Sequence, residues 1–380
     1  MIEIGADTRA AQASELMNGF AEDTGLVGGR APVRYLWTDA FAVCNLLSLG
    51  EIELALRLVD QVHRILGRRH PADGRDGWLS GLDDAIAEEH PTWGGLRIGK
   101  RLPDRREDEA FDERLEWDRD GQYFHYLTKW MQALDQVARW TGKALLNVWA
   151  RELAEVAFRA FTYVPTTGST GGRRMYWKMS VDLSRPLVPS MGHHDPLDGY
   201  VTLRQLQATA TRLDVANVGP SLAVEAAELA MMIPDGLATS DPLGLGGLLA
   251  DAWRVEQLVQ ERAISSRELR DRLIDAALDG LHAVAPSEFR RPASSRLAFR
   301  ELGLAIGLAA VPLISGADGL SPFVPLRDEI EAFWLDPANR RSTTWLEHRH
   351  INEVMLATSL VPDGYLTLAD KILTTRDDRE

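Results

Sequence analysis

Apolar residues recur along most of the chain at steps of three and four, the period of an amphipathic α-helix. Leu54, Leu58, Val62 and Ile65 form one such series. Stretches that alternate apolar and polar residues, as a half-buried strand does, are rare. We therefore predict an all-α protein.

The predicted helices fall into pairs. They span residues 34–49 with 52–66, 121–141 with 145–161, 197–213 with 222–232, 243–260 with 266–283, 296–313 with 326–334, and 345–360 with a short remainder. The first helix of each pair is richer in apolar residues and the second in charged ones, which indicates a buried helix followed by an outer one. Six such hairpins predict an (α/α)6 toroid, with an open superhelix of helix pairs as the alternative.

Two connections are much longer than the others, residues 66–118 and 162–194. Long loops in a compact domain are usually functional, so we expect both to lie over one mouth of the ring. Glycine-rich residues 168–174 predict a flap. We expect residues 1–380 to form a single domain, with a lead-in segment over 1–30 and a polar tail over 365–380.

Charge and cysteine content narrow the class of protein. The 42 basic and 56 acidic residues give 42 − 56 = −14, which disfavours partners such as nucleic acids and anionic membranes. Cys44 is the only cysteine, so disulfides within the chain and cysteine-rich zinc sites are excluded. The first twenty residues lack the pattern of a signal peptide, and we expect a cytoplasmic protein.

Unusual polar groups collect where the predicted inner helices begin. The segments are 34–39 (RYLWTD), 116–125 (EWDRDGQYFH), 193–200 (HHDPLDGY) and 345–350 (WLEHRH). The starts of all inner helices lie at one end of such a ring, so we expect the four segments to converge there.

Helix capping is the simplest alternative explanation for these acids. Asp195 before Pro196 fits an N-cap followed by Pro at N1, and Asp198 then favours the helix dipole. Thr344 and Glu347 have capping-box spacing. Capping does not account for the neighbouring histidines and aromatic residues.

Paired carboxylates suit glycosidic bond cleavage, which needs one protonated acid and one ionised base or nucleophile. We expect one acid from Asp118 or Asp120 and one from Asp195 or Asp198, with Glu347 in reserve. The sequence therefore predicts a glycoside hydrolase. Its expected substrate is a small saccharide, either neutral or anionic.

Histidines offer a second chemistry. His194 and His348 could move a proton between neighbouring sugar carbons, as in a sugar isomerase or epimerase. His193, His194, Asp195 and Asp198 could instead ligate a metal, together with a remote His348 or His350. No metal-binding motif supports this, and we predict neither metal nor cofactor. A third alternative is a non-catalytic helical scaffold.

Further residues are candidates for substrate binding. Aromatic faces can stack on a sugar ring, and basic side chains can bind an anionic substituent. Asp39 could orient a hydroxyl or simply pair with Arg34. The candidates are Arg34, Trp37, Asp39, Trp93, Arg97, Lys100, Trp117, Tyr123, His125, Trp177, His193 and His350.

With these residues at inner-helix starts, the chain resembles the six-hairpin glycosidase-like group over about residues 34–365. The group includes unsaturated glucuronyl hydrolases and relatives of N-acylglucosamine 2-epimerase. Arg34 and Trp37 are similar to a first-helix pattern of the epimerase relatives, which implies that Arg34 lines a sugar pocket. The same resemblance implies an acid/base role for His348 or His350. It leaves the sugar, the linkage and the oligomeric state open.

Overall fold

A computed structural model describes residues 5–165 and 172–368 of the chain. The chain folds into two compact units. Unit 1 contains residues 5–23, 44–52 and 235–368. Unit 2 contains residues 24–43, 53–165 and 172–234. No helix among the described residues is long and apolar enough to cross a membrane.

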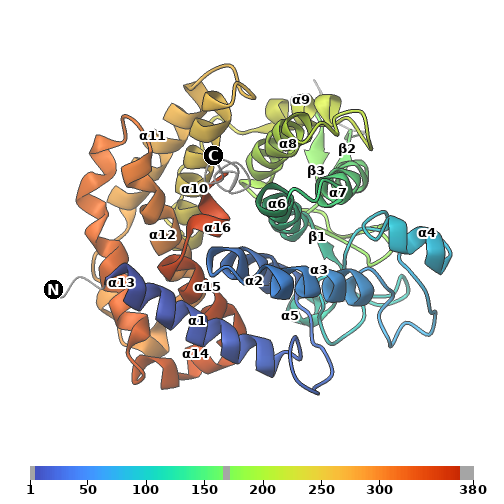
Figure 1. Cartoon of the computed structure of the whole chain (residues 1–380), viewed down its shortest axis with the longest axis horizontal. Coiled ribbons are helices and arrows are strands. Elements are labelled where there is room, and N and C mark those ends of the chain that lie inside the picture. Colours follow the sequence, from blue (N-terminus) through green and yellow to red (C-terminus); the bar gives the residue numbers. More distant parts are fainter. Residues whose placement is uncertain (1–4, 166–171, 369–380) are drawn as a thin grey trace, which may run out of the picture. The chain divides into compact units, whose positions relative to one another are not determined.

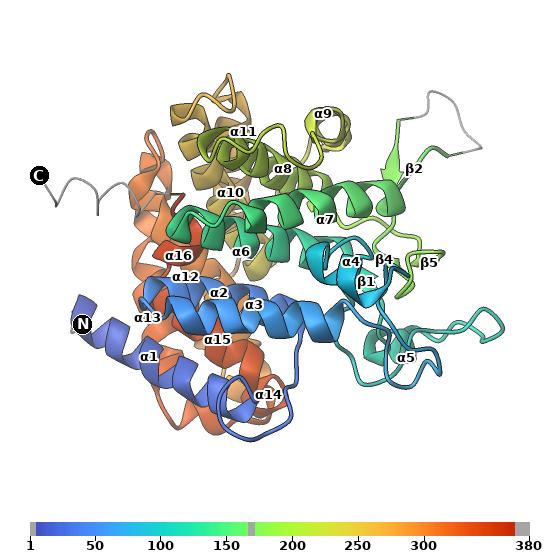
Figure 2. The ribbon, with the colours of Figure 1, turned by 45° about the vertical axis from the view of Figure 1, so that its right-hand side comes forward.

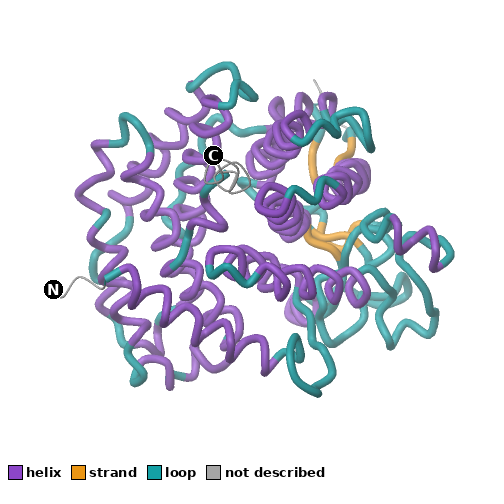
Figure 3. The backbone as a smooth tube through the Cα atoms, viewed as in Figure 1, coloured by secondary structure: helices purple, strands orange, loops and turns teal. Residues whose placement is uncertain are grey.

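Unit 1 is made of helices (Figures 1 and 3). Its α-helices are α1 (Ala6–Asp23), α10 (Pro242–Gln260), α11 (Glu268–Ala283), α12 (Ala298–Ala310), α13 (Pro325–Leu335), α14 (Thr343–Glu347), α15 (Arg349–Leu360) and α16 (Asp363–Leu366). Its 3-10 helices are η1 (Glu288–Arg290), η2 (Ala293–Ser295), η3 (Val311–Leu313), η4 (Asp318–Phe323) and η5 (Asn339–Arg341).

Unit 2 contains helices and short strands. The helices are α3 (Ile52–Leu66), α4 (Asp84–Glu89), α5 (Glu113–Asp118), α6 (Phe124–Thr141), α7 (Leu145–Phe161), α8 (Asp195–Arg212) and α9 (Ala223–Met232). The first residue of α3, Ile52, belongs to unit 1. Helix α2 (Leu36–Ser48) begins in unit 2 and continues into unit 1 at Cys44. The strands are β1 (Gln122–Tyr123), β2 (Thr162–Tyr163), β3 (Arg174–Met175), β4 (Lys178–Met179) and β5 (Pro186–Val188).

The strands form two small antiparallel sheets, β1-β4-β5 and β2-β3. In the first sheet Gln122 pairs with Met179 and Tyr123 with Lys178. Tyr123, the residue directly before α6, is thereby fixed against Lys178, which lies 55 positions later along the chain. This sheet positions part of the candidate site (orange in Figure 3).

Close helix packing in unit 1 depends on glycine. Helices α10 and α12 lie side by side (Figure 1). A Cβ added to Gly246 of α10 would lie 2.0 Å from the carbonyl oxygen of Gly303 in α12. One added to Gly307 would lie 2.5 Å from the carbonyl oxygen of Gly246. The backbones of α10 and α12 therefore lie so close together that neither Gly246 nor Gly307 has room for a side chain.

The burial of the helices agrees with the predicted alternation. Helix α6 is buried around almost its whole circumference, from Phe124 through Trp140. Helix α3 buries one face, with Ala55, Leu58, Val62 and Leu66 inside. Because a helix that is buried all round has no solvated face, α6 is an inner helix and α3 an outer one. The bounds predicted for α3 and α7 are confirmed.

Several predicted boundaries were wrong. Gln122 and Tyr123, expected in a helix, form β1. The helix expected over 345–360 is interrupted at His348, between α14 and α15. The segment expected to lead in over 1–30 contains α1, with a buried face. The polar tail predicted over 365–380 starts too early in the sequence, because Tyr365, Leu366 and Leu368 are buried and so belong to the folded unit. Of the expected flap, residues 168–171 lie outside the described part of the chain.

Candidate active site

An aromatic pocket of about 220 Å³ lies in unit 2. Trp117 comes from α5, Tyr123 from β1, and Trp177 precedes β4. The rings of Trp117 and Trp177 meet edge to face with centroids 5.4 Å apart, and Tyr123 lies 6.4 Å from Trp177. The structure therefore brings together three aromatic residues that the sequence predicted for sugar binding. The pocket is lined by Phe111, Glu113, Glu116, Trp117, Tyr123, Trp177, Val188 and Ser190.

A buried ion pair lies beside this pocket. Lys178 Nζ donates to Glu116 Oε1 at 2.9 Å and to the carbonyl oxygens of Glu116 at 2.7 Å and Arg119 at 2.9 Å. Burial lowers the pKa of Lys178, and the hydrogen bond to Glu116 opposes that shift. Arg105 Nε donates to the other Glu116 oxygen at 3.1 Å. Neither Glu116 nor Lys178 is among the predicted site residues, although Glu116 is the first residue of the polar segment 116–125.

Two carboxyl groups occupy the first turn of α8. Asp195 is 6% exposed and Asp198 is 7% exposed. Asp195 Oδ2 accepts a hydrogen bond from the Gly192 amide at 3.1 Å. Burial, and then the charge of Asp198, raise the pKa of Asp195 to about 7. Helix α8 begins at Asp195 with His194 as its N-cap residue, so the predicted N-cap role of Asp195 was wrong by one position.

Asp198 has partners that favour its ionised form. Lys129 Nζ donates to Asp198 Oδ1 at 2.8 Å, and Thr128 Oγ1 donates to Asp198 Oδ2. Both partners lie on α6, one turn after its start. A nearby cation and a hydroxyl donor stabilise a carboxylate. The first turn of α8 therefore holds one carboxyl group with a raised pKa and one that is paired with a cation, and carboxyl groups in such different environments are typical of acid/base sites.

His125 connects the carboxyl pair to the aromatic pocket. Its ring lies 5.6 Å from that of Tyr123 in a stacked arrangement. Burial lowers the pKa of His125 to about 4, while the charge of Asp198 opposes that shift. The imidazole is therefore neutral at neutral pH.

Tyr126, the next residue, extends this aromatic wall. Its hydroxyl lies 2.9 Å from that of Tyr35, and Trp37 lies 6.3 Å from its ring. Burial raises the pKa of Tyr126 well above its ordinary value. Lys100 Nζ lies 5.5 Å from the centre of the Tyr35 ring.

Arg34 and Asp39 pair with each other. Arg34 Nη1 lies 3.5 Å from Asp39 Oδ1, and Arg34 also donates to the carbonyl oxygens of Val33 and Thr24. Asp39 accepts a hydrogen bond from the Tyr35 amide at 2.9 Å. Burial raises the pKa of Asp39 to about 6, and Arg34 opposes that shift. These contacts match the interpretation in which Asp39 pairs with Arg34 and does not orient a sugar hydroxyl.

Asp120 is engaged in a buried ion pair. It is fully buried and accepts from Arg97 Nη1 at 2.8 Å and from the amides of Gly99 and Gly121 at 3.0 Å. Arg97 also donates to two backbone carbonyls of the segment around the end of α3. Asp118, in contrast, is exposed at the end of α5.

The remaining candidates in unit 2 lie at its surface or near it. Trp93 is 42% exposed, and its ring stacks on that of His90 at 4.1 Å. The rings of His193 and His194 lie 4.8 Å apart in the loop before α8. No group of three or more His, Cys, Asp or Glu side chains among the described residues could hold a metal ion.

Glu347, His348 and His350 belong to unit 1. Glu347 is exposed at the end of α14. The predicted capping box with Thr344 was wrong, because Ser342 caps α14 by accepting from the Trp345 amide. The ring of His348 contacts Phe299 at 5.5 Å.

The ring of His350 lies 6.1 Å from that of Phe20. Because His194 lies in unit 2, its pairing with His348 stays a prediction.

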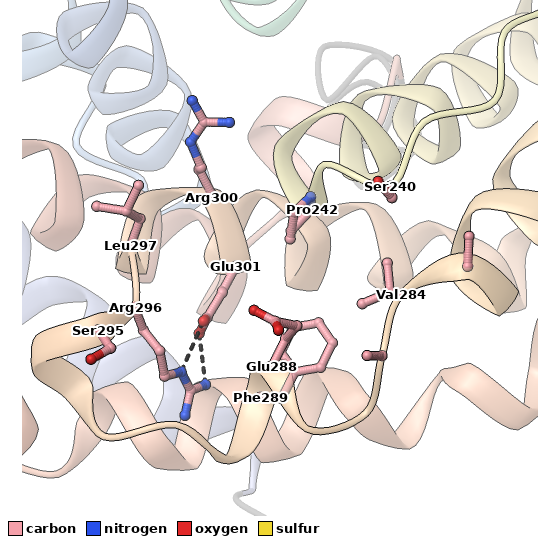
Figure 4. Close-up of a pocket in the computed structure, with 12 residues that line it drawn as sticks. Ser240, Pro242, Val284, Glu288, Phe289, Ser295, Arg296, Leu297, Arg300 and Glu301 are labelled. Carbon is pink, nitrogen blue, oxygen red and sulfur yellow. Dashed lines mark hydrogen bonds and ion pairs between the residues drawn. The ribbon is translucent and has the colours of Figure 1, made fainter.

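Unit 1 contains a second cavity, of about 480 Å³ (Figure 4). Arg296 donates to both oxygens of Glu301, through Nε at 2.8 Å and Nη2 at 2.7 Å. Trp334 Nε1 also donates to Glu301 at 2.8 Å. The carboxyl group of Glu288 points toward this pair (Figure 4). Arg296 and Glu301, two of the charged residues that line the cavity, are thus paired with each other.

Comparison with known proteins identifies the fold. No family model and no curated protein matches the sequence. A solved structure, that of a GH76 α-mannanase from Bacteroides thetaiotaomicron (a selenomethionine derivative), is similar with a TM-score of 0.56 and 10% sequence identity. The match covers 95% of this chain and 98% of that one. The predicted fold class, an all-α (α/α)6 toroid, is therefore confirmed.

Proposed function

We propose that this protein is a glycoside hydrolase in which Asp195 is the general acid. The observation that carries the proposal is a buried carboxyl group whose pKa is raised to about 7. It lies three positions before Asp198, which is paired with Lys129. A carboxyl group that keeps its proton near neutral pH can protonate a leaving glycosidic oxygen.

The second carboxylate of the proposal is Asp118. Asp120 accepts from one guanidinium and two amides, and Asp198 accepts from Lys129 and Thr128. Asp118 is exposed and makes no hydrogen bond or ion pair with the described residues. It is therefore available to activate a water molecule. In this scheme Asp198 raises the pKa of Asp195 rather than reacting itself.

The aromatic pocket supports a sugar as the substrate. Trp117, Tyr123 and Trp177 provide flat apolar faces, while Glu113 and Ser190 at its lining supply hydrogen-bonding groups. Pyranose rings have an apolar face and a hydroxyl-rich rim, which suits this combination. The fold shared with an α-mannanase supports the same class of activity.

A proton NMR time course in deuterated water tests the proposal. The protein is incubated with pooled disaccharides, aryl glycosides, sugar phosphates and free monosaccharides. We expect loss of glycosidic anomeric signals with the wild type, and a loss of turnover of at least about 100-fold in Asp195→Asn and in Asp118→Asn. Asp214→Asn is the control, since asparagine tolerates the positive φ of 57° at that position.

Two results would contradict the proposal. Deuterium incorporation at carbon 2 with intact glycosidic signals would make the protein a sugar isomerase, with the histidines at its centre. Full turnover in Asp195→Asn would remove Asp195 from the mechanism.

A further inference from the structure

Lys100 differs from the other cations around the candidate site. Lys129 pairs with Asp198 at 2.8 Å, Lys178 with Glu116 at 2.9 Å and Arg97 with Asp120 at 2.8 Å. The ammonium group of Lys100 makes no hydrogen bond or ion pair with any described residue. Its one described contact is with the Tyr35 ring, 5.5 Å from Nζ.

The backbone around Lys100 is held in place. Arg97 donates to the carbonyls of Arg68 and Ile65 as well as to Asp120. Gly99, with φ of +94°, donates its amide to Asp120 at 3.0 Å.

His70 Nε2 lies 3.2 Å from the carbonyl oxygen of Lys100 itself. These contacts hold the backbone from which the Lys100 side chain extends, so this part of the chain needs no ordering when a ligand binds.

Partial burial makes an unpaired ammonium group costly. Lys100 is only partly exposed, and burial lowers its pKa while the charges of Asp118 and Asp120 oppose that shift. Neither carboxylate is within ion-pair distance, and Asp120 is already neutralised by Arg97. An ammonium group in this position therefore lacks the short-range anion that the other site cations have.

We propose that Lys100 binds an anionic substituent, a carboxylate or a phosphate, on the saccharide that occupies the candidate site. This inference rests on the proposed function, since it names the substrate class of the same site. Lys100 contacts the Tyr35 ring, the Tyr35 hydroxyl contacts that of Tyr126, and the ring of Tyr126 contacts that of His125. The charge of Asp198 in α8 acts on His125. The anion would offset the unpaired charge, and the sugar ring would lie against the aromatic residues.

The test compares matched charged and neutral ligands. Saturation-transfer NMR and calorimetry measure binding of D-glucuronate, glucose 6-phosphate and glucose to the wild type, Lys100→Met and Arg101→Met. Methionine keeps the apolar stem and removes the charge. Arg101 is the matched control, because it is the exposed basic residue next in the chain.

We expect the wild type to bind at least one anionic ligand more tightly than glucose, by roughly 10- to 100-fold, the range of a charge-assisted hydrogen bond. Lys100→Met should abolish this preference without changing the affinity for glucose, whereas Arg101→Met should retain it. A response to glucuronate alone would identify a carboxylate, and a response to the phosphate alone would identify a phosphoryl group. Equal affinity of the wild type for charged and neutral sugars would overturn the inference.

Turnover separates this inference from the proposed function. Matched 4-nitrophenyl hexosides and hexuronides of both anomeric forms are used as substrates. Selective anion binding without any hydrolysis would leave the Lys100 site standing and refute the hydrolase. The opposite outcome is hydrolysis of neutral glycosides at a rate that Lys100→Met does not change, with no preference for charged glycosides. That outcome would support the hydrolase and refute the Lys100 site.

Discussion

Replacing Asp195 with asparagine tests the electrostatics of the site without any knowledge of the substrate. The ordinary pKa of an aspartate is 3.8, and the folded protein raises that of Asp195 to about 7. The folded state therefore holds this proton more tightly than the unfolded state does. As pH rises from about 4 to about 7, the folded state must either keep the proton or bury a charge, and its stability falls.

The magnitude follows from the size of the shift. A difference of about 3 units, at about 1.4 kcal/mol per unit, corresponds to about 4 kcal/mol of lost stability above pH 7. At pH 5 only about 1.5 kcal/mol of this cost is present, because the pH is about one unit above the unfolded pKa. Asparagine cannot ionise, so Asp195→Asn should gain roughly 2–3 kcal/mol relative to the wild type between pH 5 and pH 8.

Urea unfolding monitored by tryptophan fluorescence measures this difference at each pH. The control is again Asp214→Asn. Asp214 lies in the same unit, two residues after the end of α8, and the stability curve of this variant should run parallel to that of the wild type. Parallel curves for Asp195→Asn would show that burial does not raise the pKa of Asp195. The reasoning behind its role as the acid would then fail.

Three further changes probe the surrounding structure. Arg97→Met leaves the fully buried Asp120 without its guanidinium and should lower the free energy of unfolding by about 3–5 kcal/mol, whereas an unchanged urea midpoint would mean that the ion pair does not hold this loop. Gly246→Ala places a methyl group against the backbone of Gly303 and should lower the melting temperature by several degrees; an unchanged melting curve would show that α10 and α12 can separate at no cost. Trp177→Ala removes one wall of the aromatic pocket and should weaken sugar binding by about 0.5–1.5 kcal/mol in calorimetry without loss of helical content, and unchanged affinity would place the sugar elsewhere.

Helix positions could be predicted from the sequence where periodicity and stop residues agree. Helix α7 follows Gly142, which adopts the left-handed conformation that ends α6, and its predicted bounds match those of the structure. Helix α1 was missed, although Ala13, Leu16, Met17 and Phe20 have helical spacing and are buried. The periodicity was present in the sequence, but its significance depends on a partner helix far along the chain.

The candidate site could be predicted in part. Trp117, Tyr123 and Trp177 were recognised as possible sugar-stacking residues and do line one pocket. Their meeting depends on β1 and β4, two strands of two residues each, which are too short for any periodicity to reveal. The ion pair of Lys178 with Glu116 depends on the same pairing. It joins residues 62 positions apart, which no local pattern could connect.

The pairing of α1 with α15 has a consequence for synthesis of the protein. The two helices lie side by side in unit 1 (Figure 2). Asp23 accepts from Arg349 at 2.9 Å, and Phe20 meets the ring of His350. The ribosome makes the first partner roughly 300 residues before the second. At about 5–20 residues per second, the apolar face of α1 stays without this partner for on the order of 15–60 seconds. Nascent chains arrested before residue 349 should therefore be bound by chaperones through α1 and released when α15 emerges.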